Sequence, residues 1–163
     1  MKKHCLAFWL LLLPTFVCAQ EPNAPACGTA EAGAFDFLLG EWQLTSGSGG
    51  MRIEKILRGC SLRETWKNER GESLLFRSYD VSRQRWFLLF LMDDRLAYQS
   101  WEGRWESGQW RFYRDWVLDG QPILSRTYWN PLSAGGFEKI VEQSRDGGKT
   151  WRLHDKSVYQ RKP

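Results

Sequence analysis

Phe35-Asp36-Phe37-Leu38-Leu39-Gly40-Glu41-Trp42 is the stretch of this chain that decides the fold. It ends in a Gly-x-Trp motif. A series of short segments with alternating aromatic side chains follows and runs to Tyr159-Gln160-Arg161. Alternation with a period of two residues is typical of β-strands with one buried and one solvated face. A Gly-x-Trp motif at the start of the first strand, with an arginine in the last, indicates a small closed barrel.

Turn-forming residues interrupt the chain after Glu41 at intervals of about one strand and one turn, as at residues 47–50, 106–108 and 146–148. These intervals define about ten segments, and none of the connections is long enough for a crossover helix. We therefore predict an all-β fold, an antiparallel up-and-down β-barrel of about ten strands, with a short N-terminal helix within residues 30–39.

The N-terminus has the pattern of a secretory signal peptide. Lys2 and Lys3 precede an apolar run over residues 5–17, and small residues near Ala19 suit signal peptidase. Cys18 leaves lipid modification as an alternative, although such sites carry a smaller residue than Val17 before the cysteine. We expect a signal peptide over 1–19, an extended leader over 20–34 and a single barrel domain over 35–163. The protein would then be exported, either periplasmic or secreted.

The size and charge of the mature chain exclude several classes of protein. Removing nineteen of the 163 residues leaves about 144, which is enough for one hydrophobic core. The formal net charge of +4 falls to about +2 without Lys2 and Lys3, so nucleic acid is not an expected partner. No second apolar run approaches the length of a membrane-spanning helix. The oligomeric state is left open.

Two cysteines, Cys27 and Cys60, remain after the signal. An even number of cysteines in an oxidising compartment predicts a disulfide. The bridge would contribute about 3 to 4 kcal/mol on the chain-entropy model. A metal site is the alternative, but two cysteines and one mature histidine, His154, make a poor ligand set.

Alternation assigns side chains to the two faces of the strands. Leu62, Glu64 and Trp66 share one face of a strand. In the segment 110–116, Trp110, Phe112, Arg114 and Trp116 share one face, opposite Arg111, Tyr113 and Asp115. Residues 86–92 are apolar on both faces. We expect the N-terminal helix to cover them from outside, the alternative being an exposed patch for a partner.

A set of motifs spread over nearly the whole mature chain resembles a family of exported bacterial proteins of unknown function, which is itself similar to the calycin barrels (lipocalins, fatty-acid-binding proteins and haem-binding nitrobindins). The motifs are residues 35–42, Gly59-Cys60 followed by Glu64-x-Trp66, Tyr79-Asp80 leading to Arg85-Trp86, residues 144–151 and Tyr159-x-Arg161. The resemblance implies that Trp42 plugs the closed end of the barrel and that Arg161 lies across its ring, a stack worth about 0.5 to 2 kcal/mol. Gly40 would allow the tight turn into the first strand. The family brings no established activity.

The loop residues Ser144, Asp146, Gly148, Thr150 and Trp151 match the Asp-box of sialidase propellers. One copy in a chain too short for a propeller does not indicate a glycosidase. We interpret the motif as a staple within a hairpin, in which the hydroxyl and carboxylate oxygens accept hydrogen bonds from loop amides.

Motifs of catalysis are absent from the sequence, which holds no Gly-x-Ser-x-Gly, His-Glu-x-x-His or phosphate-binding glycine loop. We therefore expect neither an enzyme nor a cofactor. The spacing of His154 and Arg161 resembles the haem-ligand region of nitrobindins, so haem binding through His154 is a lower alternative. The polar neighbours of His154, and an alternation that turns it outward, argue against it.

A barrel cavity would be lined by aromatic side chains with a few polar anchors. The candidates are Glu64, Trp66, Arg77, Tyr98, Trp110 and Arg114. The sequence thus indicates an exported protein that binds a small apolar or amphiphilic, lipid-like molecule. The alternative is a non-catalytic module with a filled core that binds glycans or proteins through its surface.

Overall fold

The computed structural model describes residues 28–69, 71–93 and 97–163. This part of the chain forms ten strands and three short 3-10 helices. The 3-10 helices are η1 (Ala30–Gly33), η2 (Asp36–Leu38) and η3 (Leu57–Gly59). The strands are β1 (Gly40–Leu44), β2 (Gly50–Ile56), β3 (Ser61–Asn68), β4 (Gly71–Asp80), β5 (Arg85–Met92), β6 (Ala97–Glu106), β7 (Gln109–Leu118), β8 (Gln121–Pro131), β9 (Phe137–Ser144) and β10 (Arg152–Arg161).

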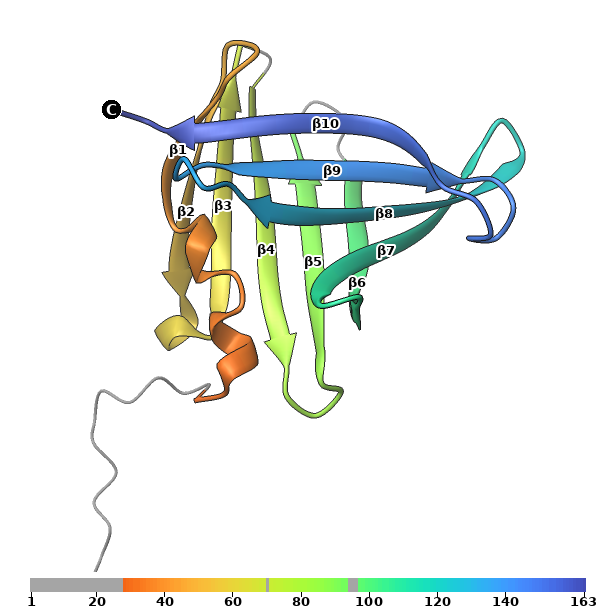
Figure 1. The fold of residues 1–163 in the computed structure, drawn as a ribbon, viewed down its shortest axis with the longest axis horizontal. Coiled ribbons are helices and arrows are strands. Elements are labelled where there is room, and N and C mark those ends of the chain that lie inside the picture. Colours follow the sequence, from red (N-terminus) through yellow and green to blue (C-terminus); the bar gives the residue numbers. More distant parts are fainter. Residues whose placement is uncertain (1–27, 70, 94–96) are drawn as a thin grey trace, which may run out of the picture.

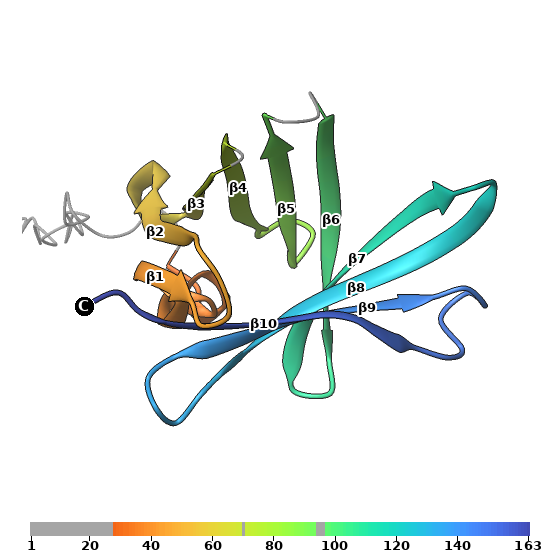
Figure 2. The same ribbon diagram turned by 90° about the horizontal axis from the view of Figure 1, so that it is seen from above.

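The strands close into an antiparallel barrel in which every strand pairs with its neighbours in sequence, and β1 also pairs with β10. In Figure 1, β8, β9 and β10 run across β3, β4 and β5, and Figure 2 shows that these two groups form opposite walls. The predicted all-β, up-and-down architecture is confirmed, and it is compatible with a calycin-like fold.

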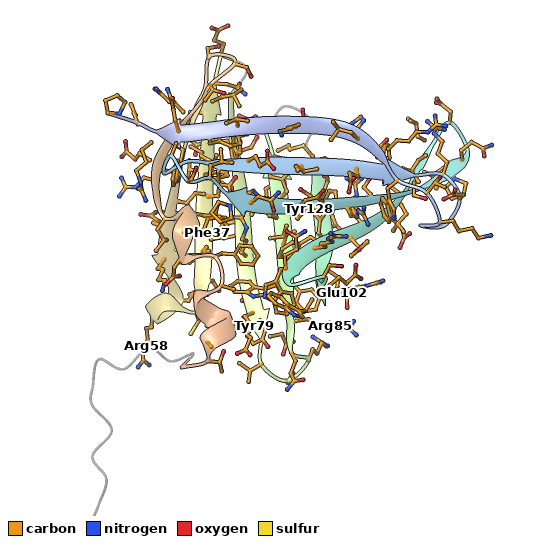
Figure 3. The ribbon with its side chains drawn as sticks, in the orientation of Figure 1. Phe37, Arg58, Tyr79, Arg85, Glu102 and Tyr128 are labelled. Atoms are coloured by element: carbon orange, nitrogen blue, oxygen red, sulfur yellow. The ribbon has the colours of Figure 1, made fainter. Side chains whose placement is uncertain are left out.

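The predicted N-terminal helix consists of the two 3-10 turns η1 and η2. Phe35 separates them because its backbone (φ −112°, ψ 15°) departs from helical geometry. The Phe35 side chain lies inside the barrel, with its ring centroid 5.0 Å from that of Trp86 and 5.6 Å from that of Phe112. Phe37 and Tyr79, labelled in Figure 3, pack against the same aromatic cluster. We call Phe35, Leu38, Trp86, Phe112 and Trp129, all buried, the packed end of the barrel.

Trp42 and Arg161 join the first and last strands, as the resemblance implied. They are direct partners in the β1–β10 register, and the Arg161 guanidinium carbon lies 4.5 Å from the centre of the Trp42 ring. The Trp42 indole N–H donates to the Leu38 carbonyl oxygen at 2.7 Å, and Arg161 donates to the Leu39 carbonyl oxygen at 3.2 Å. The two side chains therefore tie the 3-10 turns to the strand pair that closes the barrel.

The loop between β9 and β10 has the hydrogen bonds expected of a hairpin staple. The Ser144 hydroxyl accepts from the Gly148 N–H at 2.8 Å and donates to Asp146 at 2.7 Å. The Asp146 carboxylate accepts from the Thr150 N–H at 2.9 Å. These hydrogen bonds hold the pKa of Asp146 well below its usual range. Trp151 packs under the Arg126 guanidinium, whose carbon lies 4.0 Å from the ring centre.

The outer face of β5 differs from expectation. Because Phe35 and Leu38 point into the barrel, the N-terminal turns do not cover this face, and Leu89 and Leu91 each remain 38% exposed. Near the start of the strand, the outer face carries an ion pair between Arg85 and Glu102 of β6 (Figure 3).

The signal peptide, most of the leader and Cys27 lie outside the described residues. Cys60 follows η3 and directly precedes β3. Its disulfide with Cys27 therefore stays a prediction.

Gly40 provides a test of the closure. Its φ is +122°, and a Cβ there would overlap the Arg161 guanidinium. We expect Gly40→Ala to lower the free energy of unfolding by about 1 to 3 kcal/mol through backbone strain, with a further loss from the displaced guanidinium. Urea unfolding measures this. The matched control is Gly108→Ala, where φ is +79° and no atom lies within 4 Å of the added Cβ. Equal losses in the two variants would contradict the role of Gly40 in the closure.

Candidate functional site: a cavity inside the barrel

The inner faces of β3 and β7 follow the predicted alternation. Leu62, Glu64 and Phe112 are almost completely buried, and Trp129 and Phe137 complete the interior from β8 and β9. The packed end fills one part of the barrel with interlocking rings. The rest of the interior is therefore the part in which a ligand can fit.

Glu64 and Arg77 form a buried ion pair, with side chains 3% and 0% exposed. The Arg77 Nη1 donates to Glu64 Oε2 at 2.7 Å, and the Trp66 indole N–H donates to Glu64 Oε1. The Arg77 guanidinium carbon also lies 4.4 Å from the centre of the Trp129 ring. Both carboxylate oxygens are thus occupied, and the pair belongs to the packed end rather than to the cavity wall.

A cavity of about 670 Å³ occupies the remaining interior. Most of its wall is aromatic or aliphatic, and these side chains are Leu44, Trp66, Leu75, Leu88, Phe90, Trp101, Trp116, Trp129, Val141 and Tyr159. The polar and titratable lining residues are Gln99, Arg114, Ser125, Thr127, Lys139, Gln143, His154 and Ser157. An apolar wall with a few polar groups is typical of sites that bind small molecules.

Two cations, Arg114 of β7 and Lys139 of β9, face this cavity. The Arg114 guanidinium carbon lies 5.4 Å from the centre of the Trp116 ring, and the Lys139 ammonium nitrogen lies 5.8 Å from that of Trp66. Burial lowers the pKa of both groups, and for Lys139 the neighbouring charge of Glu64 opposes that effect. The cavity therefore combines ring faces with positive charge.

The structure separates the six predicted cavity residues. Trp66 and Arg114 line the cavity, whereas Glu64 and Arg77 pair with each other at the packed end. Trp110 packs against the core beside Tyr79, outside the cavity lining.

The placement of Tyr98 was wrong, because this side chain is 70% exposed on the outer face. In β6 the neighbouring positions Gln99 and Trp101 face inward instead. The prediction placed Tyr98 on or near the face that carries large apolar neighbours, but the pleat of β6 turns Gln99 and Trp101 inward, so Tyr98 points out.

His154 lies at the rim of the cavity because of a β-bulge. The β9–β10 register shifts between Leu153 and Asp155, which breaks the alternation that had placed His154 outside. His154 is exposed, and in the adjoining hollow its neighbours include Arg145 and Arg152. This polar surround does not fit the apolar setting that a haem face requires.

Within the described residues, no group of three or more His, Cys, Asp or Glu side chains could hold a metal ion.

Lys139 is a cationic cavity residue that sequence reasoning missed. The segment Glu138-Lys139-Ile140-Val141-Glu142 alternates too weakly to show which face is inside, since charged residues occur on both faces. Phe137 could have identified the inner face, because side chains two residues apart in a strand share a face. Phe137, Lys139 and Val141 therefore point to the same side of β9.

The fold and site define this protein as a closed ten-stranded antiparallel barrel with an aromatic cavity. None of the helices in the part of the chain that the structure describes is long and apolar enough to cross a membrane. No model of a known protein family matches the chain, and no curated protein sequence is significantly similar to it.

The buried ion pair can be tested by comparing one substitution with two. We expect Glu64→Gln to cost about 3 to 5 kcal/mol of unfolding free energy, because it leaves the Arg77 charge buried without a counterion. The double variant Glu64→Leu with Arg77→Met removes both charges and should fall within about 1 kcal/mol of the parent or exceed it. Urea unfolding of both variants measures the difference.

The control for that comparison is the exposed pair of Lys67 and Glu72, whose side chains are 74% and 47% exposed. Glu72→Gln should cost at most about 1 kcal/mol because solvent screens the pair. Equal costs for Glu64→Gln and Glu72→Gln would show that the interior pair is hydrated rather than buried.

Proposed function

We propose that this protein is an exported, non-catalytic binding protein that holds a small apolar or amphiphilic molecule inside its barrel. The single observation that carries the proposal is the cavity of about 670 Å³ with its mainly apolar wall. Its volume falls in the range of about 300 to 1,000 Å³ that is usual for small-molecule sites.

The wall supports binding of an apolar body. Burial of apolar surface contributes about 25 cal/mol per Å², and the rings of Trp66, Trp101 and Trp116 offer large areas of such surface. Gln99 and Gln143 provide groups that can orient a polar end. An open interior also argues against the alternative of a filled core with a binding surface outside.

Export rests on the sequence pattern of the first nineteen residues, and the Cys27–Cys60 disulfide rests on the oxidising compartment that export would provide. We propose both together. Cys60 directly precedes β3, so a bridge there would attach the leader to the barrel wall.

Binding can be tested with a neutral fluorescent probe, N-phenyl-1-naphthylamine, and a variant that fills the cavity. We expect the parent protein to bind the probe and Val141→Trp to weaken binding at least about tenfold, because the indole would occupy the ligand's space. The matched control is Ile140→Trp, the neighbouring position on the opposite face of β9, which should bind as the parent does. Melting temperatures verify that both variants fold. Native mass spectrometry of protein from the exporting cell tests for a bound molecule directly.

Export and the disulfide have one common measurement. Protein recovered from outside the cytoplasm should begin at Gln20, and its intact mass should lie two hydrogens below that of the reduced form. Cys60→Ser should lower the free energy of unfolding by about 3 to 4 kcal/mol. A full-length chain retained in the cytoplasm would contradict the export proposal.

A further inference from the structure

The charges inside the barrel do not balance. Three cationic side chains, Arg77, Arg114 and Lys139, face inward. Among the described residues a single carboxylate, Glu64, opposes them within the buried interior. Both of its oxygens are already used by Arg77 and Trp66. Arg114 and Lys139 therefore line the cavity without an ion pair in this part of the chain.

Positive charge that leaves water without a counterion is costly, and cation–π contacts offset only part of that cost. The Arg114 guanidinium carbon lies 5.8 Å from the centre of the Trp101 ring and 5.4 Å from that of Trp116. These rings hold the guanidinium in place but cannot neutralise it. A ligand with a negative charge would supply the missing counterion.

The approach to the cavity is also positive. A second hollow of about 280 Å³ shares Gln143 and His154 with the cavity, and Arg145 and Arg152 line it. The carboxylate of that hollow, Asp146, is occupied by the hydroxyl groups of Ser144 and Thr150. Two arginines against the one carboxylate of Asp146 leave this hollow with a net positive charge beside the cavity, which favours the approach of an anion.

Ring faces dominate the apolar part of the wall. Trp66, Trp101, Trp116 and Trp129 enter from four different strands, and Phe90 and Tyr159 add two more rings. Planar ligands gain stacking contacts on such a wall beyond the burial of their area, and a flexible acyl chain does not.

We propose that the molecule bound in the cavity is a planar aromatic anion, an aryl carboxylate or sulfonate. Its acidic group contacts Arg114, Lys139 adds positive charge from β9, and its rings lie against the tryptophan wall. This inference rests on the proposed function and adds to it the charge and shape of the ligand.

A pair of probes that differ only in the acidic group tests the inference. 8-Anilinonaphthalene-1-sulfonate carries a sulfonate, and N-phenyl-1-naphthylamine is the same molecule without it. We expect the sulfonate to bind at least about tenfold more tightly to the parent protein, as measured by calorimetry. Arg114→Met and Lys139→Met should each weaken sulfonate binding about tenfold and change binding of the neutral probe by no more than about twofold.

Three controls make the result specific to the cavity. Lys149→Met removes an exposed lysine from the β9–β10 hairpin and should leave both affinities unchanged. Val141→Trp should abolish binding of both probes. Because Arg114 and Lys139 take no part in the Glu64–Arg77 pair, their methionine variants should keep the parent's melting temperature or exceed it.

The outcomes separate the inference from the proposed function. If neither probe binds, the proposed function itself fails. If both probes bind equally, or if the methionine variants bind the sulfonate as the parent does, the cavity binds ligands but the anion is refuted. If laurate binds more tightly than the aryl sulfonate, the aromatic part of the inference is overturned.

Discussion

The pairing of β1 with β10 is the interaction on which the rest of the structure depends. Without it the ten strands would form an open sheet with two unpaired edges, and the inner faces would have no enclosed volume. Trp42 and Arg161 occupy this seam as direct partners, and both also bond to carbonyl groups of the segment that precedes β1. The contacts between β1 and β10 thus close the barrel and also hold the N-terminal turns in position.

The N-terminal turns divide the interior into two regions of different chemistry. Phe35 enters the barrel and packs against Trp86, Phe112 and Trp129, so one region is solid. The Glu64–Arg77 pair lies in that region, where each charge has a partner. The other region is open, and its cations have none among the described residues. The ligand site is therefore the open region of the interior. Aromatic side chains do not fill it, and its cations have no partner in an ion pair among the described residues.

Most of the fold could be predicted because the patterns that encode it are local. Alternation in segments such as 62–66 and 110–116 identified strands and their inner faces, and the glycine-rich turns set their number. The Ser144–Asp146–Thr150 hydrogen bonds were also predictable, since all their partners lie within one loop. The site was harder. Tyr98 was assigned to the wrong face because the pleat of β6 is set by pairing with other strands. The bulge in β10, which brings the exposed His154 to the cavity lining, also depends on strand pairing.

The sequence by itself determined the strand count and the antiparallel order, because turn chemistry and period-two patterning act over a few neighbouring residues. The closure by Trp42 and Arg161 was implied by the family resemblance of the motifs that contain them. Only the tertiary structure decided which inward charges are paired. The sequence made Arg77 a candidate for the cavity wall, whereas in the structure it is the partner of Glu64, thirteen positions away on the adjacent strand. Arg114 and Lys139 line the cavity without forming an ion pair within the described residues, and that depends on how distant strands meet in space.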